Sequence, residues 1–161
     1  MKNLSATIKG FITGVIMILI SIAIYYYRGS FENKLQYITY FVYIAGIIWT
    51  LAGYKQSHAE PKTFKTYFAQ GFRCFIVVAL LMVLFTWVFL MLNPHLKAEM
   101  ATQYRADLLK QGNYTPAEMD SMVLKAKEYF TTMLISVAIF GYLLIGSLVT
   151  LIGSAFLSQK K

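Results

Sequence analysis

The side chains that could carry out catalytic or metal chemistry are few and far apart in this sequence. The chain has two histidines, His58 and His95, and one cysteine, Cys74. A zinc site needs about four nitrogen or sulfur ligands, or three with a bound water molecule. The helices predicted below put the two histidines on opposite sides of a membrane. We therefore expect no metal ion and no cofactor.

Acidic residues are the other usual source of catalytic groups, and five of the seven lie in one segment, residues 94–129. These five are Glu99, Asp107, Glu118, Asp120 and Glu128. Their spacing is typical of the solvated face of a helix, on which Asp107 and Lys110 form an i, i+3 pair. The sequence has no phosphate-binding glycine loop and no serine–histidine arrangement. We therefore expect that the protein is not an enzyme. If it were one, its active site would have to lie on this segment.

The composition indicates that these groups are carried by a membrane protein. Of the 161 residues, 58% are hydrophobic and 14% are charged, against usual shares of about 45–50% and about 25%. The mean hydropathy is +0.56. A soluble globule could not bury so much apolar surface, and a disordered chain would be poorer in apolar residues. The single cysteine excludes a disulfide scaffold.

Four apolar segments free of charged residues and histidine are long enough to cross a bilayer, which takes roughly 20 residues of helix. They are residues 10–27, 35–54, 74–92 and 130–157. Continuously apolar runs favour helices over barrel strands, which alternate. The first segment could instead be a secretory signal with a weak cleavage pattern at Ser21–Ala23, but we favour a retained span, because the run is longer than usual for a signal and ends in a tyrosine anchor. We predict an all-α integral membrane four-helix bundle, a single domain over residues 1–161.

A helical hairpin outside the membrane is predicted between the third and fourth spans, over about residues 94–129. Asn93 can cap a helix that begins at Pro94, and Gly112 can end it. Thr115 and Glu118 form a capping box at the start of the next helix. Since no glycine or proline lies between Ala117 and Phe140, we expect one helix from Pro116 to about Leu157.

The segment before the third span has an aromatic helical face with basic neighbours, a pattern suited to a membrane surface. Two interpretations are open: a helix on the membrane surface, or simply the first turns of the third span. The membrane-surface residues are Phe64, Lys65, Tyr67, Phe68, Phe72 and Arg73.

Small residues recur at helical spacing on three of the spans, where they let helix backbones approach closely. These faces could meet within one chain, which we favour, or between two chains. Tyr40 and Tyr43, set deeper than the other tyrosines, could line a cavity. The helix-packing residues are Gly10, Gly14, Gly46, Thr50, Gly53, Gly146, Thr150, Gly153 and Ser154.

The orientation follows from the basic residues beside the spans. The side with both termini carries eight of them against seven on the other side, several of which lie well away from lipid. We expect both termini in the cytoplasm. The net charge of +8 is better explained by anionic lipid headgroups than by nucleic acid, for which no motif is present. The eight are Lys2, Lys9, Lys55, Lys62, Lys65, Arg73, Lys160 and Lys161.

Four local patterns together resemble a known family. They are the opening Lys9–Gly14, the entry to the third span Thr63–Phe72, the Asn93-Pro94 break with its charged insert, and the glycine-bearing last span. The chain resembles the small bacterial membrane proteins called domain of unknown function 4199, common among the Bacteroidetes. The resemblance covers nearly the whole chain. It implies a four-span inner-membrane protein, and offers no activity or functional residues to carry over.

The function expected from these features is that of a scaffold or accessory subunit working through its span faces and its hairpin. Its partners would be membrane lipids and either a second copy or other membrane proteins. The alternative is a small carrier or lipid-binding protein with a cavity inside the bundle near Tyr40 and Tyr43.

Overall fold

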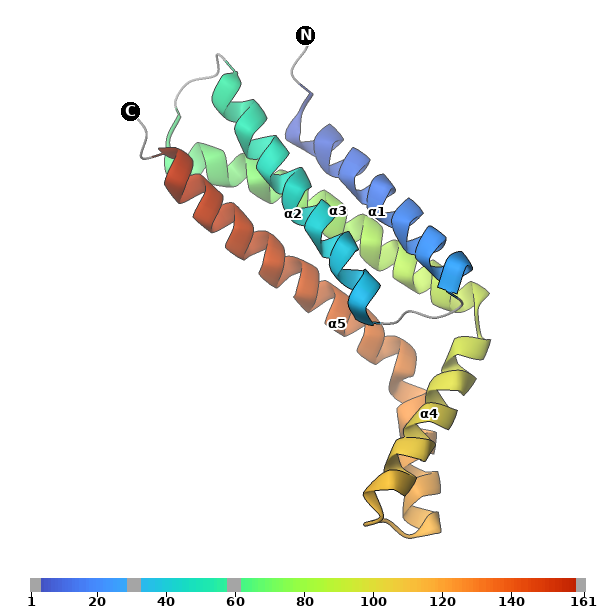
Figure 1. The fold of residues 1–161 in the computed structure, drawn as a ribbon. Coiled ribbons are helices and arrows are strands. Elements are labelled where there is room, and N and C mark those ends of the chain that lie inside the picture. Colours follow the sequence, from blue (N-terminus) through green and yellow to red (C-terminus); the bar gives the residue numbers. More distant parts are fainter. Residues whose placement is uncertain (1–3, 29–32, 58–61, 159–161) are drawn as a thin grey trace. The chain divides into compact units, whose positions relative to one another are not determined.

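The computed structural model describes residues 4–28, 33–57 and 62–158 of the chain (Figure 1). These residues form helices α1 (Ala6–Arg28), α2 (Asn33–Gln56), α3 (Phe64–Leu92), α4 (His95–Gln111) and α5 (Pro116–Ser158). No residue in the described ranges belongs to a strand. The predicted all-α fold is confirmed. His58 lies outside the described residues, as do Lys2, Lys160 and Lys161, three of the eight basic residues counted beside the spans.

Four of the helices, α1, α2, α3 and α5, are long and apolar enough to cross a membrane. A helix rises about 1.5 Å per residue, so roughly 20 residues cover the hydrocarbon core. The helix α3 begins at Phe64, ten residues before the predicted start of the third span at Cys74. The amides of Thr66 and Tyr67 bond to the Thr63 carbonyl. The basic, aromatic segment therefore forms the first turns of α3, which is compatible with a position at the membrane surface.

The chain divides into two compact units. The bundle unit comprises the described residues of 1–83 and 139–161, and contains α1, α2 and parts of α3 and α5. Its core includes Met17, Tyr43, Ile47, Phe75 and Val78. The starts of α1 and α3 and the ends of α2 and α5 lie together at one end of this unit (Figure 1).

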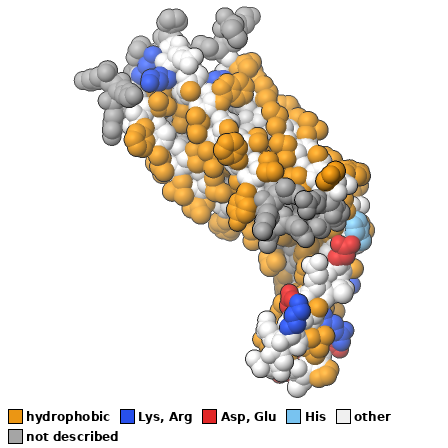
Figure 2. All heavy atoms as spheres, viewed as in Figure 1, with side chains coloured by type: hydrophobic (Ala, Val, Ile, Leu, Met, Phe, Trp, Pro, Cys, Tyr) orange, Lys and Arg blue, Asp and Glu red, His pale blue; other side chains and the backbone are white. Residues whose placement is uncertain are grey.

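This end of the bundle unit is called the basic end, after the five basic residues that it carries. On the face shown in Figure 2, blue Lys and Arg atoms gather there, whereas orange apolar side chains cover the rest of the unit. No described residue of the bundle unit is Asp or Glu; Glu32 and Glu60 lie outside the described ranges. The five basic residues are Lys9, Lys55, Lys62, Lys65 and Arg73.

The hairpin unit, residues 84–138, contains α4 and the first part of α5, which run antiparallel (Figure 1). Gly112 ends α4 in the left-handed conformation, with φ of 68°, which costs least for a glycine. Thr115 and Glu118 form the predicted capping box: the Thr115 amide donates to the Glu118 carboxylate at 2.8 Å, and the Glu118 amide donates to the Thr115 hydroxyl at 3.4 Å.

The prediction that Asn93 caps α4 is wrong. Its side-chain amide donates to the carbonyl oxygen of Phe89 at 2.9 Å, in the last turn of α3. Pro94 occupies the cap position of α4, and no side-chain hydrogen bond caps that end. The Asn93 amide group thus satisfies one of the carbonyls that the end of a helix leaves without an amide partner.

Candidate functional site

The two glycines of α1 bring its backbone against α3 inside the bundle unit. A methyl group on Gly10 would lie 2.6 Å from the carbonyl oxygen of Cys74. A methyl group on Gly14 would lie 2.7 Å from Cδ1 of Leu81. Both distances are shorter than an ordinary van der Waals contact. At Gly10 the close atom belongs to the backbone, so a larger residue would push the helices apart, whereas at Gly14 the end of the Leu81 side chain would have to move.

The small residues of α2 face α1 and α3. Gly46 leaves room for the side chain of Thr13, whose hydroxyl donates to the Lys9 carbonyl at 2.8 Å. The Thr50 hydroxyl lies 3.0 Å from the Gly46 carbonyl oxygen and 3.2 Å from the sulfur of Cys74. These buried hydroxyls bond their own helix or its neighbour, as is usual in membrane spans.

The small residues of α5 complete the interior. Gly146 lies against the Tyr43 hydroxyl and the Phe75 ring, and Gly153 lies against Leu51. Thr150 is buried beside Gly71 of α3. The Thr150 and Ser154 hydroxyls are buried and have no hydrogen-bond partner among the described residues. Eight of the nine predicted packing residues, all except Ser154, thus have identified neighbours on another helix of the chain.

The prediction that Tyr43 lines a cavity, together with Tyr40, is wrong for Tyr43. Its side chain is 0% exposed, its ring packs edge-on against Tyr142 with centroids 5.7 Å apart, and its hydroxyl donates to the Tyr142 carbonyl at 2.9 Å. Tyr40 is half-buried, with its ring 5.9 Å from that of Tyr142. Tyr43 fixes α2 to α5, because its polar atom has a partner inside the protein.

The predicted membrane-surface residues divide between the outside and the inside of the bundle unit. Lys65, Phe64, Phe72 and Arg73 are exposed and Phe68 is half-buried. Tyr67, predicted to face the membrane surface, instead lies inside the bundle unit. It is 1% exposed and packs edge-on against Tyr54, with ring centroids 5.1 Å apart. Its helical spacing matched the aromatic face, but that face is wide enough to reach the core.

Lys9 is a residue whose position the sequence analysis missed. It lies in the first turns of α1 and is only 6% exposed. Its ammonium nitrogen is 3.5 Å from the carbonyl oxygen of Trp49 and 5.2 Å from the centroid of the Trp49 ring. It also lies against Gly53, where a methyl group would collide with it. We counted Lys9 outside the first span, and no local pattern indicated that it packs against Trp49 and Gly53 of another helix.

The hairpin unit carries balanced charges on its surface. Arg105 pairs with Asp120 across α4 and α5 at 2.9 Å, with side chains 51% and 61% exposed. Lys110 pairs with Asp107 at 3.2 Å. The Thr115 amide, and then its hydroxyl, donate to Glu118 and lower the pKa of that carboxyl. Red and blue atoms lie side by side over this unit (Figure 2).

An open groove of about 390 Å³ lies at the turn of the hairpin. Its walls are both apolar and polar, and Glu118, one of the lining residues, is held by Thr115. The five lining residues are Tyr114, Ala117, Glu118, Ser121 and Met122.

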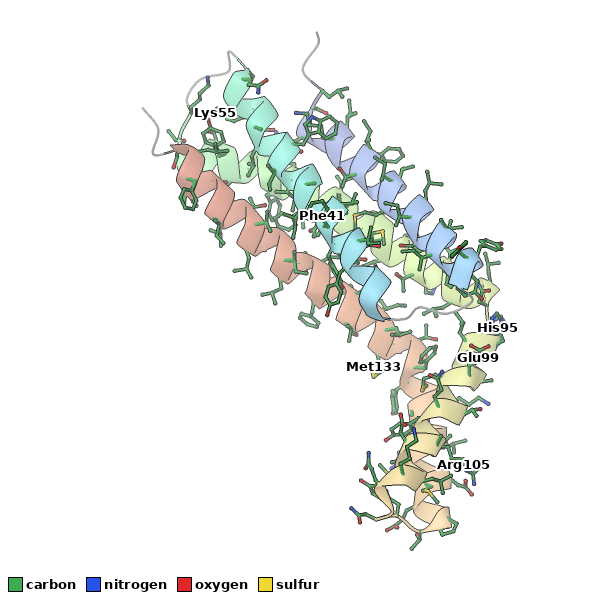
Figure 3. The ribbon with its side chains drawn as sticks, viewed as in Figure 1. Phe41, Lys55, His95, Glu99, Arg105 and Met133 are labelled. Carbon is green, nitrogen blue, oxygen red and sulfur yellow. The ribbon has the colours of Figure 1, made fainter. Side chains whose placement is uncertain are left out.

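The acidic and histidine side chains do not form a metal centre within the described ranges. No group of three His, Cys, Asp or Glu side chains there could hold a metal ion. His95 and Glu99 lie along the same side of α4 (Figure 3), one turn apart. Cys74 is a buried free cysteine.

The comparisons with known proteins identify one family. The family described as "Protein of unknown function (DUF4199)" matches residues 9–159. No curated protein and no solved structure matches the chain.

Proposed function

This chain belongs to the DUF4199 family of proteins of unknown function, and from that premise and its four apolar helices we propose that it is a multi-pass membrane scaffold or accessory subunit rather than an enzyme. The bundle unit would anchor the protein in lipid. The hairpin unit would contact a partner protein.

The observation that carries this proposal is the surface of the hairpin unit. Leu124 is 69% exposed, and Leu109 and Tyr129 are also exposed, although the unit has ion pairs and charges of both signs around them. A contiguous apolar patch with a polar rim is typical of a protein-binding surface, and we propose that these side chains contribute to one. The open groove at the turn, lined by Tyr114, Met122 and the polar Ser121, adds contact surface.

The interactions of the acidic residues support a role without catalysis. Asp107 and Asp120 are held in ion pairs, and Glu118 is held in a helix cap. A general acid or base needs a shifted pKa near the working pH, whereas the Thr115 bonds shift the pKa of Glu118 downward, away from neutrality. These carboxylates therefore have structural roles.

We assign the protein to the bacterial inner membrane, with both termini in the cytoplasm. This orientation rests on the excess of basic residues beside the spans. The shared end of α1, α2, α3 and α5 supports a common side for the two termini (Figure 1).

The test is crosslinking in native membranes from a photoreactive residue at Ser121, in the groove, with Gln103, exposed on α4, as the matched control position. We expect one discrete adduct from Ser121 and little from Gln103. The captured protein should copurify in a fixed ratio in mild detergent, and Leu124→Ser with Met122→Ser should remove it. A monomer without adducts in several detergents would contradict the scaffold role.

A separate arm tests the absence of catalysis. Glu99, Asp107, Glu118 and Asp120 are replaced together by their amides. If none of these carboxylates is catalytic, we expect the cellular phenotype of the protein to be unchanged. Loss of phenotype with the partner complex still present would favour an enzyme.

A further inference from the structure

The ammonium group of Lys9 has fewer hydrogen-bond acceptors than a buried cation needs. A lysine ammonium has three N–H donors, and burying a charge without partners is costly. Its one acceptor among the described residues is the Trp49 carbonyl oxygen, at 3.5 Å, the outer limit for such a bond. The Trp49 ring adds a weaker cation–π contact at 5.2 Å. Two donors therefore lack an acceptor in this part of the structure.

The surroundings of Lys9 are positive. No acidic side chain is present in the described residues of the bundle unit. Lys55 lies at the end of α2 (Figure 3), two residues beyond Gly53, and is exposed. Among the described residues of the bundle unit no anion is available to Lys9, so we look for the missing acceptor outside this part of the chain.

The depth of Lys9 matches the headgroup region of a bilayer. It is three residues from the start of α1 at Ala6, which is about 5 Å along the helix axis. Gly53 is likewise three residues from the end of α2 at Gln56. Phosphate groups of lipids lie at this boundary of a hydrocarbon core about 30 Å thick. Trp49, exposed beside Lys9, is the residue type enriched at that boundary.

We propose that Lys9, in the pocket formed by Trp49 and Gly53, binds the phosphate group of an anionic phospholipid at the basic end of the bundle unit. The phosphate oxygens accept charge-assisted hydrogen bonds from the two N–H groups of Lys9 that lack an acceptor among the described residues. Gly53 makes the site possible, since any side chain there would occupy the place of the ammonium. The exposed Lys55 adds attraction at longer range.

A competing explanation for Lys9 lies in α2 itself. The C-terminal end of a helix carries a partial negative charge, which favours a nearby cation. In that case Lys9 stabilises α2 and has no preference among lipids. The two explanations differ in whether lipid binding depends on Lys9.

The experiment titrates dioleoylphosphatidylglycerol into the full-length protein in dodecyl maltoside with 0.5 M NaCl, following the fluorescence of Trp49. The substitution Trp87→Phe removes the only other tryptophan. Lys9→Met should weaken binding about tenfold, because charge-assisted bonds are lost. Lys65→Met, the control at the same end, should change it less than about twofold, because salt screens exposed charges.

Two further variants keep the result decisive if Lys9→Met does not fold. Gly53→Ala keeps the charge but displaces the ammonium, and should weaken binding about fivefold. Lys9→Arg should bind within about threefold of the parent protein, since it keeps a charged donor. Dioleoylphosphatidylcholine, which has no net charge, should compete poorly.

Three results would overturn the proposal. The first is that Lys9→Met and Gly53→Ala each bind phosphatidylglycerol as the parent does, which leaves Lys9 as a helix cap. The second is that Lys65→Met loses as much affinity as Lys9→Met, which indicates diffuse attraction without a site. The third is that inorganic phosphate at the same concentration saturates the Trp49 signal, which identifies a soluble anion as the ligand. None of these concerns the hairpin unit, so the scaffold proposal is tested separately.

Discussion

Helices are held together by different means in the bundle unit and in the hairpin unit. In the bundle unit Gly10 lets the backbone of α1 meet that of α3, Gly146 makes room for the Tyr43 and Phe75 side chains, and Tyr43 bonds across helices. In the hairpin unit an exposed ion pair, a capping box and a left-handed glycine act beside a small apolar core that includes Leu108 and Met119. The first set depends on shape and works in lipid, where hydrophobic attraction between helices is absent. The second set adds charge and end groups, which water and salt affect.

The largest effect is expected from a methyl group at a close approach of two backbones. Gly10→Ala should destabilise the bundle unit by about 2 kcal/mol, because the carbonyl of Cys74 cannot move aside as a side chain would. Gly141→Ala is the control, since the nearest atom to its new methyl is the Tyr40 hydroxyl at 3.8 Å. Unfolding in mixed micelles with increasing dodecyl sulfate measures both. Equal effects would mean that close approach does not hold this unit together.

The next effect concerns the hydrogen bond between α2 and α5. Tyr43→Phe should cost about 1 kcal/mol, the usual net value of one buried hydrogen bond. Tyr40→Phe should be neutral, because its hydroxyl has no hydrogen bond to any described residue. The same unfolding assay applies. A neutral Tyr43→Phe would indicate that α5 packs on α2 by shape alone.

In the hairpin unit, Thr115→Ala should have a local effect of about 0.5–1 kcal/mol through the lost cap. Amide hydrogen exchange should rise in the first turn of α5 and stay unchanged in the bundle unit. Thr102→Ala, on the exposed side of α4, is the matched control. Faster exchange throughout the bundle would contradict the division into two units.

Acid should loosen the same cap. The bonds from Thr115 lower the pKa of Glu118 in the folded state. Their stabilisation is therefore complete above the unfolded pKa, about 4.3, and is lost as the pH falls through the folded pKa. Exchange in the first turn of α5, corrected for the intrinsic rate, should rise below about pH 4. Glu118→Gln should remove this pH dependence, and persistence in that variant would refute the assignment to Glu118.

The smallest effect is expected at the ion pair. Asp120→Asn should change the stability of the hairpin unit by less than about 0.5 kcal/mol, because both side chains are half in water. Added salt should reduce even this difference. A larger loss of stability that salt does not change would contradict this, and would mean that the Arg105–Asp120 pair is needed to hold α4 against α5.

Local patterns in the sequence predicted the helices well. Charge-free apolar runs marked the four spans, and Gly112, Thr115 and Glu118 marked the turn of the hairpin, because caps depend on residues adjacent in sequence. The predicted third span began only at Cys74 because Lys65 and Arg73 precede it, although the aromatic spacing from Phe64 already indicated a helix. Both are exposed, so the helix continues without burying their charges.

Contacts between helices were less predictable. The stripe on α2 indicated close packing, but the sequence could not reveal that Gly53 makes room for Lys9 and Gly46 for Thr13. Such pairs depend on the rotation and register of two separate helices. Tyr67 and Tyr43 were misread for the same reason, because an amphipathic position can face either lipid or a neighbouring helix.

Cysteine labelling tests the membrane placement of the four helices most directly. In a Cys74→Ala background, Ser5→Cys, Ser158→Cys and Thr102→Cys are each treated with a membrane-impermeant maleimide, before and after the membrane is permeabilised. We predict that Thr102→Cys reacts at once and that Ser5→Cys and Ser158→Cys react only after permeabilisation. Labelling of Ser5→Cys and Ser158→Cys from opposite sides, or extraction of the chain by carbonate without detergent, would contradict a four-span protein.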